Sequence, residues 1–132
     1  MAFSKIWVRQ KTDNLIFFKT KTGNASVVDG SEIHCYKGTS SVATFTADIS
    51  ELETGKTYSF ACFAQYGDRP AMCMILNSSS SSIKALSPNL NTWTDFKKTD
   101  DMKYIRITVH PTKMTAIRVM LSVGHKAYVP FI

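Results

Sequence analysis

The chain lacks any apolar run close to the ~20 residues that a membrane-spanning helix needs. Its first residues, Met1 to Val8, also lack the basic leader and long apolar stretch of a secretory signal. Disorder along the whole chain is excluded, because 44% of the 132 residues are hydrophobic and only 20% are charged. The absence of a membrane span and of a secretory signal predicts a protein that is made and folded in a cytoplasm. The length of 132 residues predicts that residues 1–132 form a single domain.

Cysteine is scarce, and its spacing carries no motif. The three cysteines, Cys35, Cys62 and Cys73, are odd in number and include no Cys-x-x-Cys pair. Cys62 and Cys73 fall inside apolar stretches, where a free cysteine behaves as a small buried hydrophobe. We therefore expect three reduced thiols and no zinc site.

Motifs for catalysis are missing as well. The ten acidic residues are scattered and nominate no carboxylate pair, and there is no nucleophile elbow and no Gly-rich phosphate loop. A Ser-His-Asp site could still assemble in space from the three histidines, which stand far apart: His34, His110 and His125. Calcium could bind near Asp95, Asp100 and Asp101, but no ligand spacing repeats, which favours a solvated loop. We expect neither an enzyme nor a cofactor.

What the chain does contain is alternation with a period of two. Thr57 to Tyr66 alternates, with Tyr58, Phe60, Cys62, Ala64 and Tyr66 on one face, and Met72 to Leu76 is apolar throughout. We expect these two strands to pair through the turn Gly67-Asp68-Arg69-Pro70 at the centre of the fold. Further patterns predict strands at 5–9, 14–19, 32–36, 41–49, 93–98, 104–110 and 116–123, with loops at 77–82 and 87–91. The predicted fold class is all-β: a two-sheet antiparallel β-sandwich of the jelly-roll type.

A polar surface could serve as a ligand-binding face. If the strands 104–110 and 116–123 form a hairpin around Pro111, then Tyr104, Arg106 and Arg118 share one face. Arginine forks and aromatic rings suit sugars, carboxylates and phosphates, although a normal sandwich exterior would look the same. Other rings near strand ends could stack on a sugar or base, and one turn arginine could contact a partner. The candidate ligand-binding residues are Trp7, Tyr66, Arg69, Trp93, Tyr104, Arg106 and Arg118.

The net charge of +6 allows other interpretations. Basic residues cluster early in the chain, at Lys5, Arg9, Lys11, Lys19 and Lys21. Such a segment can favour nucleic acid or an anionic surface, or it can be a set of solvated lysines. A single-stranded nucleic-acid binder would use it together with Trp7, Phe17 and Phe18, and its affinity would fall steeply with salt.

Three segments resemble those of one known family. Asp48 to Phe60, which ends in Gly55-Lys56-Thr57-Tyr58-Ser59-Phe60, resembles the Leu-x-x-Gly-Lys-Thr-Tyr-Thr-Phe-Ser segment of carbohydrate-binding-module-like domains in bacteriophage tail and baseplate proteins. Ile117 to Phe131 is similar to the closing Met-Leu-x-x-Gly … Tyr-x-Pro-Tyr signature of the same family. Asn14-Leu15-Ile16 resembles its Asn-Leu-Leu or Asn-Leu-Ile opening.

The resemblance implies a galactose-binding-like jelly roll in a non-catalytic virion module of the tail, baseplate, fibre or decoration, with a host-surface polysaccharide as its candidate ligand. Its partners would be other virion proteins and further copies of itself, rather than nucleic acid or a membrane. In such a homo-oligomer the contacts would come from the terminal residues Tyr128, Phe131 and Ile132. The alternatives are a purely architectural docking or oligomerisation protein without sugar binding, and the single-stranded nucleic-acid binder.

Overall fold

The computed structural model describes residues 13–23, 26–36, 42–110 and 112–131. The predicted strand at 5–9 and the candidate residues Trp7 and Ile132 therefore lie outside the described residues. Ten strands occur in the described part, and no helix there could cross a membrane. The strands are β1 (Phe18–Gly23), β2 (Ser26–Gly30), β3 (Glu32–Cys35), β4 (Ala43–Asp48), β5 (Thr57–Tyr66), β6 (Met72–Leu76), β7 (Ser82–Leu86), β8 (Thr94–Lys97), β9 (Tyr104–Val109) and β10 (Thr115–Ser122).

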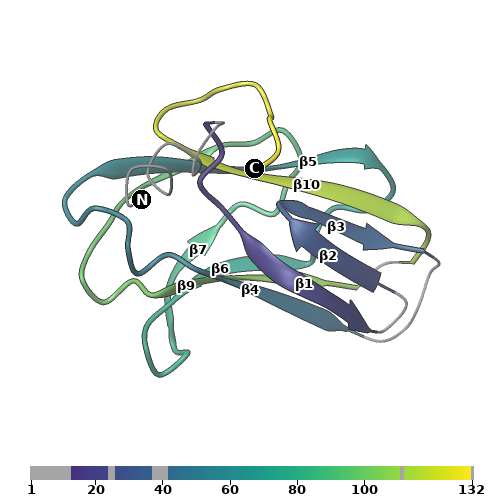
Figure 1. Cartoon of the computed structure of the whole chain (residues 1–132), viewed down its shortest axis with the longest axis horizontal. Coiled ribbons are helices and arrows are strands. Elements are labelled where there is room, and N and C mark those ends of the chain that lie inside the picture. The colour runs from purple at the N-terminus through teal and green to yellow at the C-terminus, as the bar shows by residue number, and fades with distance from the viewer. Residues whose placement is uncertain (1–12, 24–25, 37–41, 111, 132) are drawn as a thin grey trace, which may run out of the picture.

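The strands form two antiparallel sheets that pack face to face (Figure 1). The six-stranded sheet has the order β1-β2-β3-β10-β5-β8, and the four-stranded sheet has the order β4-β9-β6-β7. Four nested pairs, β3 with β10, β4 with β9, β5 with β8 and β6 with β7, belong alternately to the two sheets. This is the arrangement of a long hairpin rolled up on itself, a jelly roll, and it confirms the predicted fold class.

Two predicted strand pairings are wrong. The strands β5 and β6 keep their predicted bounds, but they lie in opposite sheets instead of pairing. The strands β9 and β10 likewise lie in opposite sheets and form no hairpin around position 111. A polar turn that contains glycine or proline reverses the chain direction in both cases: when the next strand pairs with the preceding strand in one sheet, and when it crosses to the opposite sheet. The sequence pattern therefore did not reveal these crossings.

The strand predictions also missed some elements. The strand β2 ends in Asp29-Gly30, a dipeptide typical of turns, and β7 begins at Ser82, the last residue assigned to the Ser-rich loop. The predicted strand at 14–19 overlaps β1 only at its last two residues. Residues 14–16 instead extend beside β10, where the backbone N–H of Leu15 donates to the carbonyl of Leu121.

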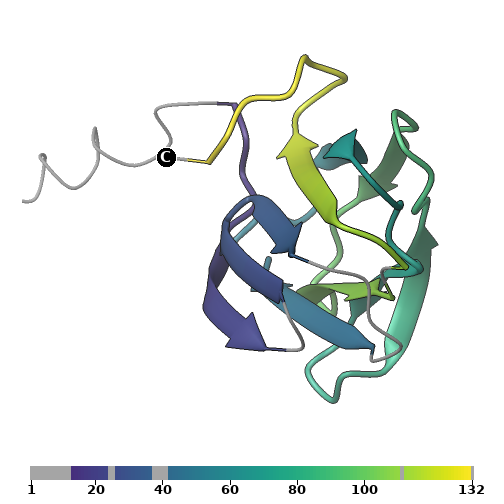
Figure 2. The ribbon, with the colours of Figure 1, turned by 90° about the vertical axis from the view of Figure 1, so that its right-hand side faces the viewer.

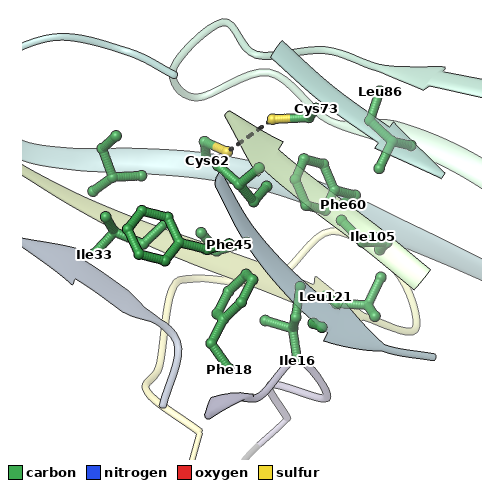
Figure 3. Close-up of a cluster of buried hydrophobic side chains, with 14 of the residues drawn as sticks. Ile16, Phe18, Ile33, Phe45, Phe60, Cys62, Cys73, Leu86, Ile105 and Leu121 are labelled. Carbon is green, nitrogen blue, oxygen red and sulfur yellow. Dashed lines mark hydrogen bonds between the residues drawn. The ribbon is translucent and has the colours of Figure 1, made fainter. Parts of the chain in front are cut away.

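The core lies between the two sheets and follows the predicted alternation. In β4 and β9 every second residue is buried. The cluster shown in Figure 3 also contains inward side chains of other segments, among them Phe60 of β5, Leu121 of β10 and Cys73 of β6. The outward side of the six-stranded sheet is also buried at Ala61, Met120 and Ser122. The segment 123–131 lies on this side of the sheet and returns toward the beginning of the described chain (Figure 2, yellow near purple). Ser122 Oγ donates to the carbonyl of Gly124, and the Tyr128 ring lies 6.0 Å from that of Phe63.

Candidate ligand-binding face

The outward side of the six-stranded sheet carries a group of charged and aromatic side chains that could recognise a ligand. Arg118 in the centre of β10 stands opposite Glu32 of β3 and Phe63 of β5. Directly opposed residues of antiparallel strands share a face, so these three side chains point outward together. The inward neighbour Ile117 belongs to the core. We call this surface the β3–β10–β5 face.

A β-bulge adds Tyr66 to this face. The pairing of β5 with β10 shifts between Ala116, opposite Tyr66, and Ile117, opposite Ala64, which leaves Gln65 as an extra residue. An extra residue reverses the alternation, so Tyr66 points outward and is 47% exposed. The uninterrupted alternation of the sequence had placed Tyr66 with the core residues, and that placement is wrong.

Four rings gather at one side of the face. The ring of Phe63 lies 6.0 Å from the ring of Trp93, edge to face, and 6.0 Å from the ring of Tyr128. Trp93 stacks on His125, with 4.8 Å between centroids and 5° between planes. Phe63, Trp93 and Tyr128 are half-buried, and His125 is exposed. These rings come from β5, from the residue before β8 and from the segment after β10.

Arg118 is held in place from three directions. Its Nη2 donates a hydrogen bond to Gln65 Oε1 at 3.3 Å, and its Nε lies 3.9 Å from Glu32 Oε2. The guanidinium carbon lies 5.6 Å from the centroid of the Tyr128 ring, within cation–π range. Glu32 is itself bonded to His34 Nε2 at 3.0 Å. Of the five N–H donors of this guanidinium, one is used by Gln65, and the Nε–H is buried without a hydrogen-bond partner. The donors that a ligand could use are therefore the other N–H groups on Nη1 and Nη2.

Tyr128 and Phe131 form hydrogen bonds and ring contacts within their own domain. The hydroxyl of Tyr128 bonds with Ser31 Oγ at 2.8 Å, and the same Oγ accepts the backbone N–H of Phe131 at 3.1 Å. Burial raises the pKa of Tyr128 above its ordinary value. The ring of Phe131 lies 5.2 Å from that of Phe17. Their expected contact with a neighbouring copy stays a prediction.

Asp95 orients the imidazole that covers Trp93. Its Oδ1 accepts hydrogen bonds from Ser59 Oγ at 2.7 Å and from His125 Nε2 at 2.8 Å, and these bonds lower the pKa of Asp95. In a Ser-His-Asp catalytic triad the histidine lies between the serine and the aspartate. Here the carboxylate of Asp95 lies between the other two groups, and the buried hydroxyl of Ser59 donates to it instead of to the histidine. The three groups therefore position a ring and do not activate a nucleophile.

The remaining predicted site residues lie elsewhere. Tyr104 and Arg106 are on the outward side of the four-stranded sheet, where Arg106 stands opposite Thr46 and Met74. The expected common surface of Arg106 and Arg118 is therefore wrong, because their strands belong to different sheets. Arg69 lies in the crossing from β5 to β6, where its Nη1 donates to the carbonyl of Pro70 at 2.9 Å.

Sequence reasoning missed several residues of the face. Phe63 could have been found from the period of two, which places it on the side of Ser59 and Gln65. His125 follows the last strand and has no periodic signal that could have indicated it. Near the same end of the sheet as Tyr66 stand two further exposed side chains, Tyr36 directly after β3 and Met114 directly before β10.

The described residues include no group of three or more histidine, cysteine, aspartate or glutamate side chains that could hold a metal ion. The three aspartates considered for calcium are engaged separately. Asp95 accepts from Ser59 and His125, Asp100 accepts from Thr54, and Asp101 accepts from Thr99.

Comparison with known proteins adds little. No protein-family model matches the sequence, and no curated protein matches it. One similar solved structure is a family 11 carbohydrate-binding module of the cellulosomal cellulase Lic26A-Cel5E of Clostridium thermocellum, at 10% identity. The match covers 89% of this chain and 86% of that one, with a TM-score of 0.37. At these values the likeness carries no inference about ligand or site residues.

Proposed function

We propose that this chain is a non-catalytic β-sandwich module that binds a glycan on the β3–β10–β5 face. The observation that carries the proposal is that Arg118, held by Glu32 and Gln65, lies directly beside the aromatic side chains of this face. A sugar ring offers an apolar C–H surface to aromatic rings and hydroxyl groups to charged or amide side chains. The face presents both kinds of group side by side.

The contacts of Arg118 reduce the cost of binding. A free arginine side chain loses rotamer entropy when it is immobilised by a ligand. Here Gln65, Glu32 and the Tyr128 ring already restrict the guanidinium. Tyr66 beside Gln65 supplies an exposed ring close to this fixed group.

The biological setting within the proposal is a bacteriophage virion, as a tail, baseplate, fibre or decoration component. This part rests on the resemblance of Asp48 to Phe60 and of Ile117 to Phe131 to segments of such domains. The second of these segments is also the one that carries His125 and Tyr128 onto the face. The candidate ligand is then a polysaccharide of the host surface.

A docking or oligomerisation function is the second candidate. Tyr36, Tyr66 and Met114 are 58%, 47% and 54% exposed, and a cluster of exposed apolar side chains can also recognise a protein. The nucleic-acid alternative is weaker, because Phe18 is fully buried in the core and cannot stack on a base. Light scattering at two salt concentrations separates the oligomer from the monomer.

The test of glycan binding is a glycan array followed by titration calorimetry on any retained sugar. We expect Arg118→Ala and Tyr66→Ala each to weaken binding about tenfold or more. The matched controls are Arg106→Ala and Tyr104→Ala, which remove the same residue types from the opposite sheet. Equal losses in both pairs, or retention of no glycan at all, would overturn the proposal.

A further inference from the structure

Two buried thiols from opposite sheets face each other in the core. Cys62 on β5 and Cys73 on β6 place their Sγ atoms 4.0 Å apart, and both residues are at most 1% exposed. Figure 3 shows the two side chains pointing toward each other, joined by the dashed line. Cys35 is buried too, but among the described residues the sulfur–sulfur contact joins only Cys62 and Cys73.

We propose that Cys62 and Cys73 are a modification site, a thiol pair that a low-molecular-weight disulfide converts into a disulfide between the two sheets. The sulfur atoms must approach from 4.0 Å to about 2.0 Å, and rotation about each Cα–Cβ bond moves them between staggered positions. The chain already joins the sheets beside this pair, because Leu86 pairs with Cys73 and Leu90 bridges to Cys62. The proposal does not depend on glycan binding.

The reaction is a pair of thiol–disulfide exchanges. One cysteine thiolate attacks oxidised glutathione, which forms a mixed disulfide and releases one glutathione thiolate. The second cysteine thiolate attacks the mixed disulfide at the protein sulfur and releases the other glutathione. Two protein thiols thus lose two electrons and two protons in total, and one oxidised glutathione becomes two reduced ones.

The folded protein resists this reaction, so it takes place during folding. The hydrogen bond with Cys73, together with burial, holds the pKa of Cys62 well above its usual value, which keeps Cys62 in the thiol form. Glutathione also has no path to a side chain that is wholly buried. A chain that folds in a reducing medium therefore keeps free thiols, whereas one that folds in an oxidising medium closes the bond.

The test refolds the chain from denaturant in a mixture of oxidised and reduced glutathione, or in reduced glutathione alone, and then alkylates it in denaturant. We expect all three cysteines to be alkylated after reducing refolding and only Cys35 after oxidising refolding. Trypsin does not cleave between Arg69 and Pro70, so one peptide, 57–84, contains both Cys62 and Cys73. In the oxidised sample this peptide carries no alkyl group and is two hydrogen atoms lighter than the unmodified dithiol.

The oxidised form is expected to melt roughly 5 to 10 °C above the reduced form, because the bond restricts the unfolded chain. Cys35→Ala should retain the disulfide and the rise in Tm, and Cys73→Ala should lose both. Alkylation of all three cysteines after oxidising refolding, a bond that includes Cys35, or a stable glutathione adduct on Cys62 would each overturn the proposal. If Cys73→Ala does not fold, the alkylation pattern of the wild type and of Cys35→Ala decides alone.

Discussion

The side-chain nitrogen of Asn14 donates a hydrogen bond to the backbone carbonyl of Val129 at 2.9 Å, across 115 positions of the chain. The same nitrogen donates to the carbonyl of Val119 at 2.8 Å, and the amide oxygen accepts the N–H groups of Ile16 and Leu121. Asn14 is fully buried, and these four bonds use the whole capacity of its amide. One side chain therefore ties the start of the described chain to β10 and to the C-terminal segment.

Replacing Asn14 should lower the free energy of unfolding by more than the small size of the side chain suggests. In Asn14→Ala four backbone groups lose their partner, and each buried unsatisfied group costs roughly 1 to 3 kcal/mol. Since some of these groups can reach water after relaxation, we expect a loss of about 3 kcal/mol in the free energy of unfolding, measured with urea. The control, Asn89→Ala on the exposed loop before β8, should change stability by less than about 0.5 kcal/mol. Similar midpoints for the two variants would contradict the role of Asn14.

Alanine substitutions at two glycines with the same φ angle distinguish the cost of backbone strain from the cost of a steric clash. Gly67 and Gly55 both have φ of +90°, which disfavours any side chain. A Cβ at Gly67 would lie 2.4 Å from the carbonyl oxygen of Met114 and 2.5 Å from the Cα of Thr115, whereas a Cβ at Gly55 would meet nothing within 4 Å. We expect Gly67→Ala to lose about 2 kcal/mol more stability than Gly55→Ala in paired urea titrations. Equal losses would mean that the close approach beside Gly67 relaxes freely.

The stability of the fold should decrease in acid. Thr112 donates its hydroxyl and its backbone N–H to Asp68 Oδ2 at 2.7 and 2.8 Å, and these bonds lower the pKa of Asp68. Because the folded pKa lies below the unfolded value of about 3.9, this stabilisation is present above about pH 4 and is lost as the pH falls through the folded pKa.

The variant Asp68→Asn tests this pH dependence. It should be less stable than the wild type at pH 7, and the difference should shrink below about pH 4, where the wild-type carboxylate is itself protonated. Thr112→Val, which keeps the carboxylate but removes the hydroxyl donor, should show a smaller difference in the same sense. Urea unfolding at several pH values measures both, and a difference that is constant with pH would contradict the assignment.

The sequence predicted elements better than it predicted their partners. A period of two reports that one side of a strand is buried, so β5 and β6 were found with their bounds. The same period does not say which sheet a strand joins, so Arg106 and Arg118 were wrongly placed on one surface. The bulge at Gln65 has no sequence signature, yet it decides that Tyr66 faces outward. Tyr66, Trp93 and Arg118 were among the predicted ligand-binding residues, and the structure places them on or beside this face. The segment after β10, which brings His125 and Tyr128 to the face, has no periodicity that could have indicated it.

Tyr128 offers a way to separate binding from stability on the β3–β10–β5 face. Its hydroxyl bonds to Ser31 Oγ, while its ring lies against Phe63 and Arg118. Tyr128→Phe removes only the hydroxyl, so we expect a loss of about 1 kcal/mol in stability and unchanged affinity for any glycan the wild type retains.

Tyr128→Ala also removes the ring that restrains Arg118, so the guanidinium must be ordered by the ligand itself. We expect this variant to lose about 3 kcal/mol in stability, as large-to-small changes of half-buried rings do, and several-fold in affinity as well. Calorimetric titration of the three proteins below their unfolding range measures the affinities, and urea titration measures the stabilities. If Tyr128→Phe weakened binding as much as Tyr128→Ala, the hydroxyl would be a direct ligand contact and the ring would not be the restraint on Arg118.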